Sequence, residues 1–199
     1  DLSNFYTSKV IYMEHMFSNC KFLEFLNIDN FNTSSVQDMK FMFLGCTYLK
    51  SLNLSSFDTK SVEYMNGMFY GCSSLKSLDL SLFKTDSTKN MAYMFYKAKS
   101  ITSLNISNFI TPNVENMIFM FNGCTSLALL DISNFNTTKI KSMDGLFCEC
   151  TSLKDLDISK FNTKLVTSMK YMFNKCSSLT YIDLSSFNTP LLGLIDHMF

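Results

Sequence analysis

The sequence has no excess of charge of either sign. Its 199 residues include 17 lysines and arginines and 17 aspartates and glutamates, so the formal net charge is zero, and neither sign forms a long run. Proteins that bind nucleic acids or anionic membranes usually have a basic patch or stripe. We therefore expect no nucleic acid partner.

Long hydrophobic runs are also missing. No stretch approaches the roughly 18 consecutive apolar residues that predict a transmembrane helix, and the N-terminus lacks the basic-then-apolar pattern of a signal peptide. We expect no direct membrane insertion by this segment. Because the sequence starts inside a repeat at "DLSNF" and stops inside one at "DHMF", we expect a piece of a longer polypeptide, with any signal, anchor or cap outside it.

Groupings typical of active sites are missing too. The two histidines, His15 and His197, lie in the first and last repeats, too far apart to form a dyad, and are predicted to lie on a helix surface. Neither has a serine or cysteine nucleophile with a fixed partner. Paired carboxylates for acid–base chemistry are equally unsupported. We predict a non-enzymatic protein with no catalytic residues, no cofactor and no metal.

What the sequence does contain is a strict 26-residue repeat. The unit reads L-x-x-L-[DN]-[LI]-S-x-F-x-T-x-x-V-x-x-M-x-x-M-F-x-G-C-x-S, and a period of this length with spaced leucines is typical of leucine-rich solenoids. Stacked units bury the apolar faces that one unit cannot bury alone. One phenylalanine column recurs without a slip at Phe5, Phe31, Phe57, Phe83, Phe109, Phe135, Phe161 and Phe187.

The repeat predicts the fold class and the domain organisation. We expect an α/β repeat solenoid of the leucine-rich-repeat type, with a parallel β-sheet on one face and short helices on the other. Residues 1–199 would form one solenoid of about eight coils. The expected coils are a partial coil 1–22, six full coils 23–48, 49–74, 75–100, 101–126, 127–152 and 153–178, and a partial coil 179–199.

Two halves of each unit have different periodicities. The Leu-Asp-Leu alternation at residues 78–80 predicts a short parallel strand with Asp79 on its outer face. The apolar positions from Val62 to Cys72 have spacings of 3, 3, 1 and 3, which predict one buried face of a short helix. Thr59 and its equivalents are predicted to cap the N-termini of these helices.

Residues able to adopt a positive φ follow each predicted helix. Glycine or asparagine occupies this position in four units: Asn19, Gly45, Gly71 and Gly123. In three others it holds Lys97, Glu149 and Lys175, for which we expect a different turn.

The phrases "GCSSLKSLDLSLF" and "FNTKLVTSMKYMFNKCSSL" closely resemble the 26-residue BspA-like leucine-rich repeat of bacterial, mycoplasmal and protist surface proteins. The resemblance covers essentially the whole chain. It implies a leucine-rich-repeat solenoid in a secreted or surface-anchored protein that adheres to host, matrix or neighbouring cells. It implies no catalytic motif.

Sulfur-containing residues are concentrated on the predicted helix face. All fourteen methionines lie in two repeat columns, which favours core packing over a copper site. Six of the seven cysteines share a third column: Cys20, Cys46, Cys72, Cys124, Cys150 and Cys176. Ala98 replaces the missing member, so buried free thiols are favoured over disulfides and, least of all, metal ligands. Cys148 lies outside this column and is predicted to be an exposed thiol.

The outer face of the predicted sheet is the candidate partner-binding surface. Its central column is Asp or Asn, and like charges about 5 Å apart repel unless a cation or basic partner neutralises them. A solvated polar ladder between coils is the simpler alternative. Large apolar residues occur in the neighbouring column. The predicted binding residues are Leu129, Asp131, Asp155, Asp157, Tyr181 and Asp183.

Four N-x-S/T sequons provide candidate N-glycosylation sites. Asn32 and Asn136, in the predicted crossover, are better placed than the strand residues Asn53 and Asn105.

Three functions agree with the sequence. The first is an extracellular or cell-surface adhesion or recognition module that presents its sheet to a protein or glycan. The second is a structural repeat that self-associates end to end into a filament or stalk through uncapped ends. The third is an intracellular interaction scaffold, favoured only by cysteines that are expected to be reduced.

Overall fold

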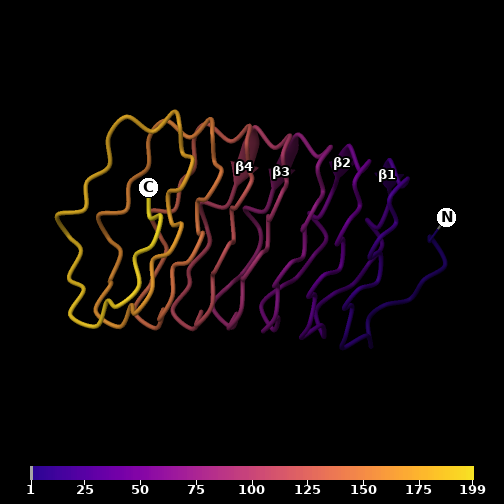
Figure 1. Ribbon diagram of the computed structural model, residues 1–199. Coiled ribbons are helices and arrows are strands. Elements are labelled where there is room, and N and C mark those ends of the chain that lie inside the picture. The colour runs from indigo at the N-terminus through magenta and orange to yellow at the C-terminus, as the bar shows by residue number, and fades with distance from the viewer. Residues whose placement is uncertain (1) are drawn as a thin grey trace.

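The computed structural model describes residues 2–199, which form a stack of similar coils with the two chain ends at opposite ends of the stack (Figure 1). Hydrogen bonds join each coil to the next at the repeat distance. For example, the Met13 N–H donates to the Asp38 carbonyl at 2.9 Å, and the Met39 N–H donates to the Tyr64 carbonyl at 2.9 Å. The predicted repeat register is therefore the register of the stack.

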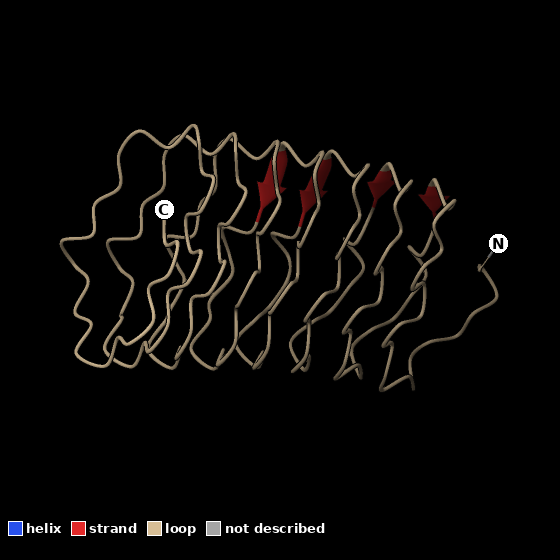
Figure 2. Ribbon diagram, viewed as in Figure 1, coloured by secondary structure: helices blue, strands red, loops and turns tan. Residues whose placement is uncertain are grey.

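Four short strands lie on one side of the stack, shown in red in Figure 2. They are β1 (Phe25–Leu26), β2 (Ser51–Leu52), β3 (Ser77–Asp79) and β4 (Ser103–Asn105). β1 pairs in parallel with β2, and β3 with β4, each residue lying opposite its equivalent in the next coil. The predicted strand position and parallel pairing are confirmed in these four coils, whereas the strands expected in residues 127–199 do not form. The sheet itself is divided into two pairs rather than continuous.

The predicted helices are wrong. No segment of residues 2–199 is helical, and the side opposite the strands consists of consecutive turns (Figure 2). The described part of the chain therefore has no helix that could cross a membrane.

The turns replace the helix because the backbone N–H groups donate to the next coil. In one coil the N–H groups of Phe41 and Phe43 donate to carbonyls one coil further on, both at 2.9 Å, while the intervening Met42 N–H closes a turn onto the Met39 carbonyl at 3.2 Å. An α-helix requires each N–H to bond four residues back. Residues 2–199 satisfy these groups between coils instead.

Positive φ angles at two positions per coil also exclude a helix. At the first of these positions, the expected positive φ is confirmed for Asn19, Gly45, Gly71 and Gly123, whose φ values lie between 59° and 73°. The expectation of a different turn at Lys97, Glu149 and Lys175 is wrong, because their φ values of 56°, 59° and 61° are equivalent. A second column, not anticipated from the sequence, comprises His15, Phe41, Gly67, Tyr93, Phe119, Gly145, Tyr171 and His197.

The predicted apolar face is confirmed as the core even though it is not helical. Val62, Met65, Met68, Phe69 and Cys72 are all fully buried. Phenylalanines of successive coils stack with ring centroids 5.6 to 5.8 Å apart throughout one column: Phe17, Phe43, Phe69, Phe95, Phe121, Phe147, Phe173 and Phe199. A three-residue apolar spacing buries one side of a turn as well as one side of a helix.

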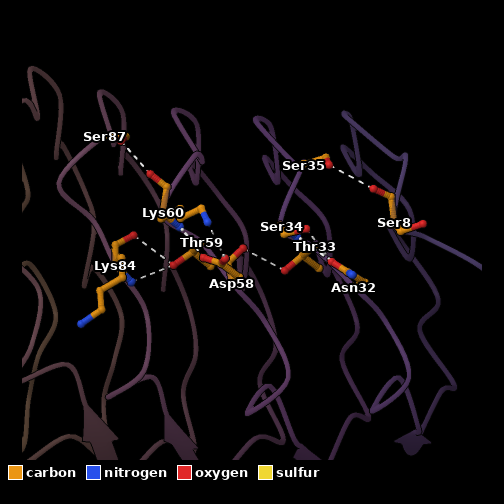
Figure 3. Close-up of polar contacts among 10 residues, drawn as sticks. All are labelled: Ser8, Asn32, Thr33, Ser34, Ser35, Asp58, Thr59, Lys60, Lys84 and Ser87. Carbon is orange, nitrogen blue, oxygen red and sulfur yellow. Dashed lines mark hydrogen bonds and ion pairs between the residues drawn. The ribbon is translucent and has the colours of Figure 1, made fainter.

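The predicted threonine N-caps are also wrong, and these side chains join coils instead. The buried Thr59 hydroxyl donates to the Lys84 carbonyl at 3.0 Å and accepts the Lys84 N–H at 2.8 Å (Figure 3). Seven threonines donate to the next coil in this way: Thr7, Thr33, Thr59, Thr85, Thr111, Thr137 and Thr163.

Candidate partner-binding groove

Four of the six predicted binding residues line one open groove of about 540 Å³ on the strand side. The groove begins at β4 and extends over the corresponding segments of the next two coils. Its lining comprises Thr102, Ser103, Leu104, Leu129, Leu130, Asp131, Asp155, Leu156 and Asp157. The structure thus brings together Leu129, Asp131, Asp155 and Asp157 as a single concave surface.

The base of the groove is apolar, and one further apolar side chain in its lining is largely exposed. Leu130 and Leu156 are buried, at 9% and 5% exposure, whereas Leu129 is 71% exposed. This alternation follows the period of two in an extended chain, where neighbouring side chains point to opposite faces. Leu129 is therefore available for contact with another molecule.

Two of the groove carboxylates are fixed by their own coil. Asp131 Oδ1 accepts the Ser133 N–H at 3.0 Å, and Asp157 Oδ1 accepts the Ser159 N–H at 2.9 Å. Hydrogen bonds from these serines lower the pKa of both carboxyl groups, with a smaller contribution from the charge of Lys160. Both side chains are exposed and are anionic at neutral pH.

Asp155 has a different environment. Its side chain is exposed and makes no hydrogen bond or ion pair with any residue from 2 to 199. Lys160, which lies near the other two carboxylates, donates its Nζ to the Ser133 carbonyl at 3.1 Å. No basic residue is part of the groove lining, so the groove has a local excess of negative charge.

The backbone of the groove lacks the pairing seen in β3 and β4. Within the described chain, the N–H and C=O groups of residues 129–131 and 155–157 have no backbone hydrogen bonds. In the β3–β4 pair, Asp79 lies opposite the neutral Asn105. The next coils instead place Asp131, Asp157 and Asp183 in equivalent positions, where like charges opposite each other destabilise pairing.

Tyr181 and Asp183 do not belong to the groove, so the six predicted residues do not form one surface. Tyr181 is 74% exposed and lines a separate hollow near the C-terminus together with Lys175 and Phe199. Asp183 is exposed and accepts the Ser185 N–H at 2.8 Å, which lowers its pKa. The error arises because sequence columns do not show where the surface is concave.

The polar ladder, the simpler alternative for the strand face, is largely internal to each coil. Asp79 accepts the Ser81 N–H at 2.9 Å, as the equivalent aspartates do in their coils. Near the N-terminus one side-chain hydrogen bond joins two coils, because Asn53 Nδ2 donates to Asp29 Oδ1 at 2.9 Å. Asp131 and Asp157 therefore each stabilise a turn of their own coil while their side chains stay exposed.

The predicted burial of the cysteine column holds for Cys46, Cys72, Cys124 and Cys150 but not for the exposed Cys20 or the half-buried Cys176, and the prediction of an exposed thiol at Cys148 is wrong. Cys148 is only 8% exposed, and burial raises its pKa, whereas Cys20 is the exposed thiol. Burial also raises the pKa of Cys124 to about 12. Across residues 2–199 no three His, Cys, Asp or Glu side chains are grouped to hold a metal ion.

The two preferred sequons both form local turns. Asn32 is exposed and its Oδ1 accepts the Ser34 hydroxyl at 2.7 Å; Asn136 is half-buried and accepts the Thr138 hydroxyl at 2.7 Å. Asn32 is thus the more accessible of the two, and glycosylation of either stays a prediction.

The second positive-φ column contains a feature that the sequence reasoning missed. Rings of adjacent coils stack in pairs: His15 on Phe41 at 5.0 Å, Tyr93 on Phe119 at 5.5 Å, and Tyr171 on His197 at 5.2 Å. After the first two pairs the next coil has glycine, where a Cβ would collide with the preceding ring. The signal was visible as an aromatic, aromatic, glycine order, and both histidines are exposed parts of this column.

Comparison with known families agrees with the repeat architecture. The family described as "Mycoplasma protein of unknown function, DUF285" matches residues 1–109, 48–129 and 115–199, which together include every residue. The chain belongs to this family. The overlapping DUF285 matches are expected of a sequence built from one recurring unit. No curated protein matches the chain.

Proposed function

We propose that this chain is a non-enzymatic recognition module of an extracellular or cell-surface protein. It adheres to a protein or glycan partner through the groove around Leu129. The observation that supports this proposal is the concave surface formed by Leu129, Asp131, Asp155 and Asp157, because large exposed apolar side chains beside fixed polar groups are typical of contact sites.

The resemblance to BspA-like leucine-rich repeats supports the same proposal. Its 26-residue unit and leucine spacing occur throughout this chain, and repeat stacks provide extended surfaces suited to partner binding. Membership of DUF285 supports the repeat architecture but indicates no activity, since that family is described as of unknown function. The surface location and the leucine-rich-repeat class are parts of the proposal.

Adhesion of the immobilised chain tests the proposal. Beads coated with residues 1–199 are incubated with epithelial cell layers and with extracellular matrix, and bound beads are counted. The groove variant combines four changes: Leu129→Ala, Asp131→Asn, Asp155→Asn and Asp157→Asn. Asparagine keeps an oxygen that can accept the serine N–H bonds, so the variant removes charge and apolar contact without removing the turns.

A matched control makes the same chemical changes elsewhere. The control variant combines Leu82→Ala, Asp58→Asn, Asp79→Asn and Asp86→Asn, and Leu82 is 58% exposed. We expect the wild type and the control variant to adhere equally and the groove variant to lose at least about five-fold. Equal adhesion of the groove variant, with an unchanged melting temperature, would reject the groove as the adhesive surface.

End-to-end stacking of copies of residues 1–199 would place two like charges next to each other. Glu14 and Asp196 occupy the same repeat column, so copies stacked in register would bring the two carboxylates together. Each already pairs with a lysine of its neighbouring coil, Glu14 with Lys40 and Asp196 with Lys170. A concentration-dependent increase in sedimentation coefficient would favour the filament over the adhesion module.

The intracellular scaffold differs from the proposal only in location. Antibody labelling of intact cells, compared with permeabilised cells, distinguishes the two. Labelling that requires permeabilisation would overturn the proposed surface location while leaving the groove as a binding site.

A further inference from the structure

We infer that the partner of the groove is a cationic, extended protein segment, which places an apolar side chain on Leu129 and lysine or arginine side chains on Asp131, Asp155 and Asp157. This inference rests on the proposed function and specifies the partner of the same groove. It excludes a neutral glycan as the principal ligand.

Charge is the first argument. The groove lining contains three carboxylates and no basic residue. Lys160, whose charge makes only a small contribution at Asp131 and Asp157, donates to the Ser133 carbonyl. Asp155 makes no hydrogen bond or ion pair among residues 2–199. A basic segment would therefore find unneutralised carboxylates, and complementary charge promotes encounter and orientation between partners.

The separation of the carboxylates is the second argument. Asp131 and Asp157 are fixed to the backbone of different coils by their own serines, and successive coils in such a stack are about 4.8 Å apart. A bound Ca²⁺ instead requires several oxygens within about 2.6 Å of one point. The described residues contain no such grouping, so separate basic side chains fit better than one metal ion.

The apolar component is the third argument. Leu129 is 71% exposed in the same lining as the carboxylates, and Leu130 and Leu156 are buried. An aliphatic side chain placed on Leu129 would remove apolar area from water. A neutral sugar carries no charge to complement the three carboxylates, and a sulfated or acidic glycan would be repelled. A protein segment with both basic and apolar side chains can contact Leu129 and all three carboxylates.

Fluorescence anisotropy with three labelled peptides tests the inference. The first peptide alternates leucine and lysine; the second replaces its leucines with serine; the third replaces its lysines with glutamate. Each is titrated with the 199-residue chain at 20 mM and 150 mM salt. We expect saturable binding of the first peptide, at least five-fold weaker binding of the second, and no binding of the third.

Variants of the chain show whether the peptide binds at the groove, and they separate groove binding from attraction to the overall charge of the chain. The groove variant should weaken binding of the leucine–lysine peptide at least ten-fold. The control variant, with the same change in net charge, should remain within two-fold of the wild type. Leu129→Ala alone should weaken binding equally at both salt concentrations, because an apolar contact is not screened. A variant with only the three groove Asp→Asn changes should bind with a reduced salt dependence.

Several results would overturn the inference. They are absence of saturable binding to the leucine–lysine peptide, equal effects of the groove and control variants, or competition of the peptide by micromolar Ca²⁺ with calorimetric evidence of calcium binding. If the groove variant still abolishes adhesion to cells while the peptide does not bind, the inference fails and the proposed function stands. If adhesion is also unchanged, both fail.

Discussion

The Thr59 hydroxyl makes two hydrogen bonds to the backbone of Lys84, one to its carbonyl at 3.0 Å and one from its N–H at 2.8 Å. Thr59 is fully buried, so water cannot replace these bonds. Equivalent threonines donate to the backbone 25 residues further on, which makes the column a continuous link between coils.

Replacing Thr59 with valine should destabilise the stack. Valine keeps the shape but leaves the Lys84 backbone groups without their buried partner, at a cost of about 1 to 3 kcal/mol. Urea unfolding followed by circular dichroism measures the change. Thr167→Val is the control, because the Thr167 hydroxyl also donates to another coil, at 3.0 Å to the Lys141 carbonyl of the preceding coil, but is exposed. An equally large loss in the control would contradict the argument from burial.

Gly67→Ala should also destabilise the protein. The φ of Gly67 is 62°, and a Cβ there would collide with the Phe41 ring. The left-handed backbone alone costs a non-glycine residue about 1 to 2 kcal/mol, so the total loss should exceed about 2 kcal/mol with the added collision. The measurement is again the free energy of unfolding.

Gly193→Ala is the matched control for this prediction. No atom lies within 4 Å of a Cβ added at Gly193, and its φ is not positive. We expect a change within about 0.5 kcal/mol, as for other surface substitutions. Adding Phe41→Ala to Gly67→Ala should recover only part of the loss, because the backbone strain remains. Complete recovery would show that the φ contributes nothing.

How far the sequence predicts this fold depends on which interactions lie within one coil. The repeat register, the strand position at residues 77–79 and the burial of Met65 and Phe69 follow from periodicity. The turns in place of helices do not, because the same apolar spacing fits both. Turns form instead of helices because N–H groups bond to another coil and because residues such as Lys97 have a positive φ. The lysine side chain does not indicate a positive φ.

The groove shows the same limit. Leu129 and Asp131 were predictable from their columns, since both properties belong to one coil. The exclusion of Tyr181 from the groove was not predictable, because concavity depends on how three coils are arranged. The burial of Cys148 was likewise hidden, since the residue that covers a side chain lies in a different coil.

Thiol labelling should distinguish Cys20 from Cys148. Cys20 is exposed, whereas Cys148 is 8% exposed and its pKa is raised by burial. Because the thiolate is the reactive species, native protein treated with a maleimide at pH 7 should be modified first at Cys20. Peptide mass spectrometry identifies the site. Cys20→Ser should remove the rapid phase and Cys148→Ser should retain it; the opposite pattern would contradict the burial of Cys148.

Hydrogen exchange should show that the groove backbone is less protected than the paired strands. Residues 129–131 and 155–157 lack backbone hydrogen bonds, whereas residues 77–79 of β3 pair with β4. Amides without hydrogen bonds exchange without a bond having to break, whereas bonded amides exchange only after a local opening. We expect deuterium uptake within seconds in the groove segments and at least ten-fold slower uptake at Leu80, whose N–H bonds to the Asn105 carbonyl at 2.9 Å.

Acid should destabilise the stack through its strand-side aspartates. Hydrogen bonds with serine lower the pKa of Asp131, Asp157 and Asp183 in the folded chain. A folded pKa below the unfolded value of about 3.9 stabilises the protein above that value, and the contribution is lost as pH falls through the folded pKa. We expect an almost constant contribution from pH 7 to about 5 and a decline below about pH 4.

Asparagine substitutions separate this effect from general acid unfolding. Asp131→Asn, Asp157→Asn and Asp183→Asn together keep oxygens that can accept the serine N–H bonds but cannot titrate. The melting temperature of this variant should therefore decline less steeply below about pH 4 than that of the wild type. Identical slopes for the triple variant and the wild type would show that the serine bonds do not stabilise the charged carboxylates.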